Sequence, residues 1–428
     1  MISWLILILI TIIGFIICFF GKNEKYFVLR PDFFLFLSIY IYTIPISLNI
    51  LLGENRFAIT DQNLQIILIC TISFLIFFLI GFHLVPTKKG NGLSLSSINI
   101  NYSHKSALFI AGVGLLVYVL NIKKSGGLVS LFILQRAELM ETQQGILSIG
   151  ILVWKAGILL IMARSWMITS LSTNRSQIFK YIGFIMLFSF IILNVLVGDR
   201  RIMVGLLIGV AFLFLIKNKT RISVKSLIIP LIIAVFFTHF ISKVRHLTFD
   251  PVTMFTSIFT TFETSWLDIS EGEVGAVFYV FNELLEDPNG INYLYGESYI
   301  KMPLILIPNF IVGQRTYNGL GDWFANKYHY DVWLTGGAFG FPFIAEAYIN
   351  FWFFGTIIIG FIIGIGLKLW WNFCIINKPS VFSLALYALS LSMIFTLPRT
   401  DFSFVVKEFI LSSLFSVLII GIIGKIRV

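Results

Sequence analysis

Charged side chains are scarce in this chain of 428 residues. Only 12% of its residues are Asp, Glu, Lys or Arg, 58% are hydrophobic, and the mean hydropathy is +0.93. A soluble domain needs more charge on its surface, so this composition excludes a water-soluble globular protein. Cysteine is scarce as well. Cys18, Cys70 and Cys374 all lie in or beside apolar runs, so nothing indicates a disulfide framework or a zinc site.

A signal peptide is also missing. The first apolar segment has no basic region before it and no small-residue cleavage site after it, so we expect a first membrane span. Acidic residues are fewer than basic ones, and the net charge is +10. In a multi-pass membrane protein, basic linkers set the topology and contact anionic headgroups, so we do not expect nucleic acid as a partner.

Long apolar runs make up most of the chain. A span needs about 20 largely apolar residues. Eleven runs qualify: Ile2–Phe20, Phe33–Leu52, Leu64–Val85, Ala107–Ile122, Ile146–Met162, Tyr181–Gly198, Ile202–Ile216, Ser226–Ser242, Phe343–Leu367, Val381–Leu397 and Phe409–Ile423. The expected fold is all-α, a polytopic membrane bundle of about 11 spans with one large external loop between the eighth and ninth spans.

The linkers predict the orientation. Alternate linkers, starting with the one after the first span and ending with the C-terminal tail, hold 17 Lys and Arg residues, whereas the other set of short linkers holds 8. Because cytoplasmic linkers are enriched in positive charge, the first set is expected inside. The N-terminus and the large loop are then outside the membrane, and the C-terminus is inside.

The large loop divides the chain into a bundle at 1–242, the loop at 243–342, and a second part of the bundle at 343–428. The loop holds 11 of the 21 acidic residues but only 5 of the 31 basic ones, which indicates the working part of the protein. A capping box at Ser270–Glu273 and apolar residues at helical spacing up to Leu285 predict an amphipathic helix. We expect this helix on the outer membrane surface or packed as a cap on the bundle.

Four arginines are candidates for binding phosphate or pyrophosphate at the outer interface. Arg200 and Arg201 follow Asp199 in a tight external turn, against the charge trend of the other linkers. The alternative is a topological outlier paired with Asp199. Arg245 follows the eighth span, and Arg315 follows the short apolar piece at 302–312. Both fit ligand contacts or ordinary interfacial residues. Arginine suits phosphate because its planar fork makes paired hydrogen bonds.

His329 and Glu346 are the candidate catalytic acid/base groups. Histidine is the side chain best suited to accept a proton at physiological pH, and His329 lies between two tyrosines, so it could take a proton from a sugar hydroxyl. Glu346 lies a few residues into the ninth span, where a carboxylate is costly unless it is paired or functional. Lys155, within the fifth span, fits a cavity lining or a pair between helices. No metal-ligand cluster is visible, and no cofactor is expected.

Three features together resemble the Wzy polymerases, which make O-antigen and capsule polysaccharide in bacteria. They are the proline-bounded piece Pro303–Pro308, the polar aromatic loop after it, and the glycine-rich run Thr335–Gly340 that leads into Ala345–Phe351. The plan of many spans with one dominant external loop late in the chain is similar too.

The resemblance implies a glycosyltransferase in the bacterial inner membrane. Such an enzyme transfers a growing glycan from undecaprenyl pyrophosphate to an incoming lipid-linked repeat unit. Its partners would be the undecaprenyl-pyrophosphate-linked oligosaccharide, membrane lipid and, as a candidate, a chain-length regulator protein. Three alternatives stay open here: an O-antigen ligase, a flippase for lipid-linked oligosaccharides, and a non-catalytic assembly protein.

Overall fold

The computed structural model describes residues 2–21, 29–53, 58–86, 102–124, 127, 149–167, 174–197, 200–218, 273–287, 290–306, 319–334, 338–377 and 379–425. Over these ranges the chain is helical and forms no strand, which confirms the predicted all-α fold. Within the described residues, the bundle contains ten long helices: α1 (Ile2–Gly21), α2 (Pro31–Leu51), α3 (Asp61–Leu84), α4 (His104–Lys124), α7 (Ile149–Met167), α8 (Asn174–Val197), α9 (Arg200–Asn218), α17 (Phe343–Trp371), α18 (Val381–Thr396) and α19 (Phe402–Lys425).

These ten helices match ten of the expected spans. Within the described ranges, eight of them, α2, α3, α4, α7, α8, α17, α18 and α19, are long and apolar enough to cross a membrane, and α1 and α9 are shorter apolar helices. The expected span Ser226–Ser242 lies outside the described residues. The polytopic helical bundle is therefore confirmed, whereas the count of about 11 spans and the sidedness stay predictions.

Several helices begin before the apolar run that predicted them. The span expected at Phe409–Ile423 belongs to α19, which begins at Phe402. Lys407 and Glu408 interrupt the apolar run, which is why a hydropathy window starts after them. In the folded chain the Glu408 carboxylate is buried against a lysine of another helix, so the helix continues through it.

Close helix pairs are built on small residues. A Cβ atom on Gly360 or Gly364 of α17 would lie 2.7 or 2.2 Å from a backbone carbonyl oxygen of α3, so only glycine allows this approach. A Cβ atom on Gly157 of α7 would likewise lie too close to the backbone of Ala111 in α4. Small residues at helix contacts are typical of membrane bundles, because close backbone packing replaces the hydrophobic effect there.

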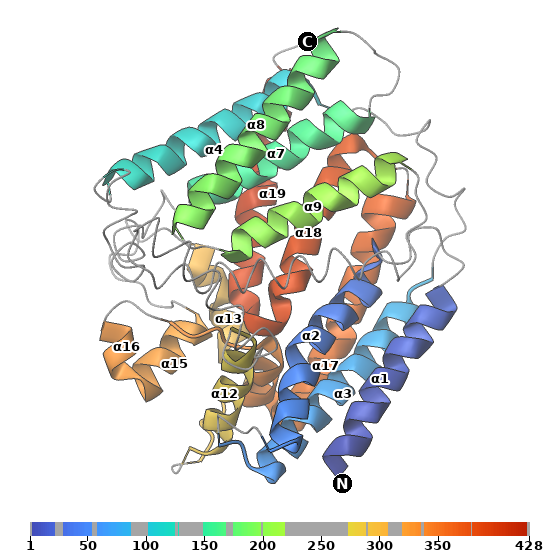
Figure 1. Ribbon diagram of the computed structural model, residues 1–428, viewed down its shortest axis with the longest axis vertical. Coiled ribbons are helices and arrows are strands. Elements are labelled where there is room, and N and C mark those ends of the chain that lie inside the picture. Colours follow the sequence, from blue (N-terminus) through green and yellow to red (C-terminus); the bar gives the residue numbers. More distant parts are fainter. Residues whose placement is uncertain are drawn as a thin grey trace, which may run out of the picture.

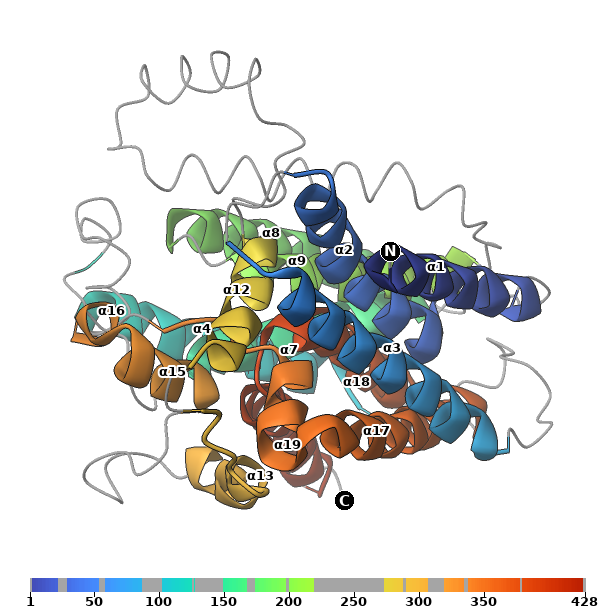
Figure 2. The same ribbon diagram turned by 90° about the horizontal axis from the view of Figure 1, so that it is seen from below.

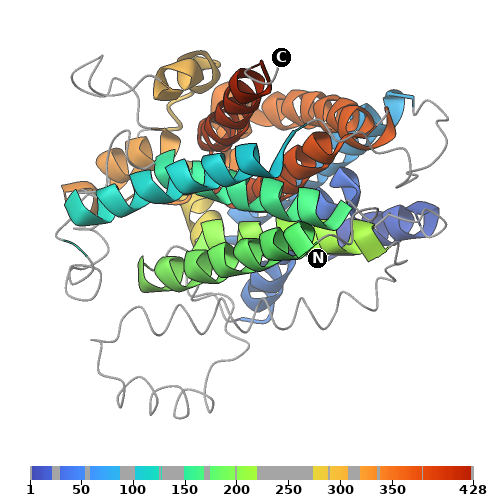
Figure 3. The same ribbon diagram turned by 90° about the horizontal axis from the view of Figure 1, so that it is seen from above.

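The helices form two groups. Figure 3 shows α4, α7, α8 and α9 running side by side, and α1, α2, α3 and α17 form the other part of the bundle (Figure 1). The short helices of the 243–342 loop are α12 (Glu273–Leu285), α13 (Glu297–Lys301), η6 (Met302–Leu306), α15 (Leu320–Tyr328) and α16 (Tyr330–Leu334). Of these, α12, α13, α15 and α16 gather on one side of the bundle (Figure 2).

The predicted amphipathic helix is α12, and it packs onto the bundle. Phe278, Phe281 and Leu284 are buried, and the helix contacts α2 and α3. Asn63 at the start of α3 donates to the Asn282 side-chain oxygen at 3.0 Å. Between α2, α3 and α12 lies a cavity of about 20 Å³ with a mainly apolar lining. The contacts with α2 and α3 agree with a cap on the bundle, and the placement of α12 relative to the membrane surface stays a prediction.

The ninth expected span is not one continuous helix. Phe351 (φ −142°, ψ 24°) and Trp352 (φ 54°, ψ −150°) break α17 after its first two turns. A positive φ at tryptophan is strained, and such strain persists only where the surroundings hold it. The part from Phe353 to Trp371 is about 28 Å long at 1.5 Å per residue, close to the thickness of a bilayer core. The part after the break is therefore about long enough to cross a bilayer core without the buried turns before it.

Candidate active site

Glu346 lies in the first turn of α17 and is fully buried. One carboxylate oxygen accepts a hydrogen bond from the Ser298 hydroxyl at 2.8 Å, and the other accepts the backbone N–H of Phe402 at 2.6 Å. Ser298 belongs to α13, and Phe402 is the first residue of α19. The carboxylate thus joins three elements that are far apart in the sequence, and both of its oxygens are occupied.

Asn350, one turn after Glu346, extends this network to the helix break. Its amide nitrogen donates to the Ser298 hydroxyl and to the Glu346 carbonyl, both at 2.8 Å. Its side-chain oxygen accepts the Gly296 N–H at 3.0 Å. The Ile349 carbonyl accepts the Leu294 N–H at 2.8 Å. The chain around 294–298 therefore satisfies the polar groups beside the break in α17 and fixes its shape.

Asp401 caps α19 on the other side of the same junction. It accepts the Phe404 N–H at 2.8 Å and the Ser403 hydroxyl, and it also accepts the N–H of Leu320, the first residue of α15, at 3.2 Å. Two carboxylates, those of Glu346 and Asp401, thus lie where α15, α17 and α19 begin. The positive ends of helix dipoles favour anions, which offsets part of the cost of burying two acidic groups together.

His329 lies at the opposite end of α15. Its Nε2 atom is 2.8 Å from a Glu283 carboxylate oxygen and 3.2 Å from the Tyr279 hydroxyl, and both partners are on α12. The ring packs against Phe324 and Phe339, with centroids 5.7 and 4.7 Å away. The side chain is 21% exposed. A carboxylate at Nε2 favours the tautomer that carries its proton there, which leaves Nδ1 free to accept one.

Tyr279 is a neutral partner in this group. Burial, together with the hydrogen bond to Glu283 and the charge of that carboxylate, raises the pKa of Tyr279 to about 12. The phenol therefore stays protonated at physiological pH and can act only as a neutral hydrogen-bonding group. His329 and Glu283 are then the groups of this cluster whose charges matter for proton transfer.

A second polar contact fixes α15 to the end of α12. The Asp287 carboxylate accepts hydrogen bonds from Lys327 Nζ and from the Tyr328 hydroxyl, each at 2.7 Å. Burial raises the pKa of Tyr328, and the hydrogen bond to Asp287 raises it further. The two ends of α15 are thus held by different carboxylates, Asp401 at its start and Asp287 at its end.

The structure does not bring the two predicted acid/base residues together. Glu346 reaches the junction where α15 begins, and His329 follows the last residue of α15. The nine residues of α15 span about 13 Å at 1.5 Å per residue. Glu346 binds groups of α13 and α19, whereas His329 binds groups of α12, so the two side chains share no hydrogen-bond partner among the described residues. His329 is partly open to solvent, whereas Glu346 is enclosed.

The arginine candidates are only partly described. Arg200 and Arg201 are the first two residues of α9, and two residues outside the described ranges separate them from the end of α8 at Val197. The end of α8 and the start of α9 lie on the same side of the molecule as α12, α15 and α16 (Figures 1 and 2). Arg245, Arg315 and the residues Thr335–Gly337 lie outside the described residues.

Comparison with known proteins identifies the family. A family model described as O-antigen polysaccharide polymerase Wzy matches residues 1–427, the whole chain but its last residue. The chain belongs to the Wzy O-antigen polymerase family. No curated protein and no solved structure matches it. Wzy polymerases act on lipid-linked oligosaccharide repeat units in membranes, in agreement with the many apolar helices found here. The resemblance stated from the sequence is thus confirmed.

Sequence reasoning missed most partners of the two acid/base candidates in this Wzy polymerase. Asp401 could have been found, because an aspartate directly before an apolar run is a helix-capping signal. Asn350 had a signal as well, since it lies four residues after Glu346 and therefore on the same helical face. Glu283 and Tyr279 had none, because their relation to His329 depends on how α12 and α15 pack.

Proposed function

We propose that this protein transfers a growing glycan from undecaprenyl pyrophosphate to a sugar hydroxyl of an incoming lipid-linked repeat unit. The acceptor hydroxyl oxygen attacks the anomeric carbon of the donor. The bond from that carbon to the pyrophosphate oxygen breaks, and undecaprenyl pyrophosphate leaves with the bonding electrons. The proposal is supported by the family match over residues 1–427. We place the reaction at the outer face of the bacterial inner membrane.

His329 is proposed as the general base. The observation that carries this assignment is the 2.8 Å contact between His329 Nε2 and the Glu283 carboxylate. The carboxylate orients the ring and stabilises the imidazolium that forms when Nδ1 takes the proton of the acceptor hydroxyl. An imidazole held by a carboxylate is a common arrangement for general bases that work near neutral pH. The partial exposure of the ring gives a sugar access to it.

Arg200 and Arg201 are proposed to bind the pyrophosphate, together with Arg245 and Arg315. Two cations in the first turn of α9 oppose the helix dipole, which favours negative charge at that end. A bound pyrophosphate would offset the repulsion between the two arginines and their unfavourable interaction with the dipole, because it would pair with the guanidinium groups at a helix N-terminus, which favours anions. The same contacts would stabilise the charge that develops on the leaving group.

Glu346 is proposed to position the site. Its oxygens are occupied by Ser298 and Phe402, and its side chain is fully enclosed, so it holds α13 and α19 against α17. A base must be within hydrogen-bond reach of the proton that it removes. His329 satisfies the access requirement better than Glu346 does.

The test is the length of the glycan made in a deletion strain. The strain is complemented with the wild type, Arg201→Ala or His329→Gln, and with Lys301→Ala as a control. The control removes an exposed charge of the same loop, paired with Glu297 within α13. We expect a full ladder for the wild type and the control, and single capped repeats for the other two at equal protein levels.

Other results would contradict the proposal. A deletion strain that keeps its ladder would show that another protein polymerises the glycan. Loss of every surface repeat, single ones included, would indicate a ligase or a flippase. Full ladders from both variants would leave the polymerase activity in place and refute the assignment of these residues.

A further inference from the structure

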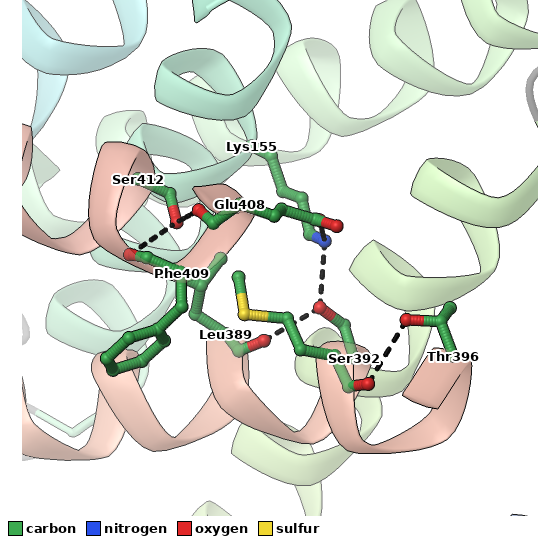
Figure 4. Close-up of polar contacts among 8 residues, drawn as sticks. Lys155, Leu389, Ser392, Thr396, Glu408, Phe409 and Ser412 are labelled. Atoms are coloured by element: carbon green, nitrogen blue, oxygen red, sulfur yellow. Dashed lines mark hydrogen bonds and ion pairs between the residues drawn. The ribbon is translucent and has the colours of Figure 1, made fainter. Parts of the chain in front are cut away.

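Lys155 is a cation buried inside the helical bundle. It lies on α7, and its side chain is 1% exposed. Its Nζ atom is 3.0 Å from a Glu408 carboxylate oxygen of α19 and 2.8 Å from the Ser392 hydroxyl of α18 (Figure 4). Charged groups within membrane spans are costly and are rarely kept without a use. The pair that was one of the two expectations for Lys155 is therefore present, and it joins three helices.

A fourth helix meets the same point. A Cβ atom on Gly205 of α9 would lie 2.7 Å from Ser392 Cβ and 3.2 Å from Lys155 Nζ. The backbone of α9 thus rests directly on the buried charge group. Gly205 is four residues after Arg201, one helical turn along the same face of α9. The contact with Lys155 fixes the position of α9 along its own axis and its rotation about that axis. These two quantities determine where Arg200 and Arg201 lie.

The other side of the junction leads to the acid/base site. Glu408 lies seven residues after Asp401, two turns along the same face of α19. At the start of α19, the Phe402 N–H binds Glu346 and the Asp401 carboxylate binds the first residue of α15. The orientation of α19 thus determines where α15 begins, and α15 carries His329 at its far end.

We propose that Lys155 is a positioning residue that sets the arginine-bearing helix α9 in register with α19 and the acid/base site. Apolar side chains pack against one another in several registers that differ little in energy. A buried ion pair with a hydrogen bond has one favourable geometry, and its known use is to specify register. Ser392 completes the geometry, because its hydroxyl accepts from Lys155 and donates to the Leu389 carbonyl at 2.7 Å.

The proposal rests on the proposed function only for its effect on polymerisation. Its geometric part is independent, because it concerns the distance between α9 and α19. We therefore pair a distance measurement with the glycan ladder. Spin labels replace Phe214 of α9 and Leu418 of α19, which are 51% and 53% exposed. The labels are introduced after the three cysteines have been replaced, and the protein is studied in lipid nanodiscs.

Three variants separate the effect of the α9 register from the effect of the buried charge. Lys155→Met leaves Glu408 buried without its cation. The exchange Lys155→Glu with Glu408→Lys restores an ion pair in the reverse order. Gly205→Ala leaves the ion pair intact but adds a methyl group against Ser392, so that α9 must shift. Arg30→Met is the matched control. It removes a buried ion pair with Asp32 at the start of α2, where the guanidinium also lies over the Phe82 ring of α3, so the disturbed contacts belong to α2 and α3 and not to the pair α9 and α19.

We expect Lys155→Met and Gly205→Ala to change or broaden the α9–α19 distance and to lower polymerisation roughly 100-fold, since misplacement of about 1 Å can have that effect. The exchange should restore both readouts, and Arg30→Met should change neither at equal protein amounts. Unchanged distances in Lys155→Met would overturn the proposal. So would an exchange variant with a restored distance and no polymerisation, because Lys155 would then act chemically.

The outcome also separates the two proposals. If the wild type makes no ladder in the deletion strain while Lys155→Met still changes the distance, the register role stands and the polymerase assignment fails. If the ladder appears for the wild type and persists in Lys155→Met and Gly205→Ala although both change the α9–α19 distance, the polymerase assignment stands and the positioning role fails.

Discussion

Replacement of Glu346 distinguishes a positioning carboxylate from a catalytic one. Alanine at this position would leave the Phe402 N–H and the Ser298 hydroxyl without their acceptor in a buried site. An unsatisfied buried donor costs about 1–3 kcal/mol, and the lost methylene packing adds to it, so we expect Glu346→Ala to destabilise the fold by about 3–5 kcal/mol.

Glutamine should be tolerated much better. Its oxygen can accept the Phe402 N–H, and its amide can donate to the Ser298 oxygen once that hydroxyl turns away. The loss is then the difference between charge-assisted and neutral hydrogen bonds together with the interaction with the start of α19, about 1–2 kcal/mol. This loss of stability in Glu346→Gln is reduced further because a neutral group does not repel Asp401, whose carboxylate lies at the same junction.

The assay combines thermal unfolding in detergent with the glycan ladder. If Glu346 positions the site, Glu346→Gln unfolds slightly below the wild type and keeps a ladder, while Glu346→Ala unfolds far lower and loses it. A general base cannot be replaced by an amide. A Glu346→Gln protein that is as stable as expected but makes only single repeats would therefore refute the positioning role and make Glu346 the catalytic carboxylate.

Three further predictions concern other parts of the molecule. His329→Gln should lower the polymerisation rate of the purified protein by about 10²- to 10⁴-fold, and Glu283→Gln by less, because it leaves the base in place and removes only its orienting charge; equal rates for the wild type and His329→Gln would contradict this. The raised pKa of Tyr279 gives the folded state stability that is complete below pH 10 and is lost as pH rises through about 12, so Tyr279→Phe should flatten that alkaline loss in unfolding curves. Gly364→Ala should lower the unfolding temperature, because its Cβ would lie 2.2 Å from a backbone oxygen of α3, whereas Gly366→Ala, with open space around it, should not.

The sequence was sufficient for features that depend on local pattern. Hydropathy located all ten long helices, and helical spacing located α12, because both signals lie within a single stretch of chain. Hydropathy could not locate the break at Trp352. The run from Phe343 onward has the mean hydropathy of a single span despite Glu346 and Asn350, and the break depends on hydrogen bonds from the chain around 294–298, about 50 residues away.

The same distinction applies to the candidate site. Residue type alone singled out His329, Glu346 and Lys155, because ionisable groups are rare in or beside apolar segments. Their partners could not be predicted, since Glu283, Phe402 and Glu408 are brought to them only by tertiary packing. The sequence offered His329 and Glu346 as two candidates for the base in one stretch of chain. In the structure their partners belong to different elements, since His329 contacts α12 and Glu346 contacts α13 and α19.

The way α15 is held explains how a loop outside the bundle can support a defined reaction geometry. A catalytic base must stay within a fraction of an ångström of its productive position, and a loop fixed at one end cannot provide that. Here Asp401 holds the start of α15 through the Leu320 N–H, and Asp287 holds its end through Lys327 and Tyr328. Asp401 belongs to the start of α19, and Asp287 follows α12, which packs on α2 and α3. The histidine at the end of α15 is thereby fixed relative to the membrane helices themselves, which is the frame in which a lipid-linked substrate would be held.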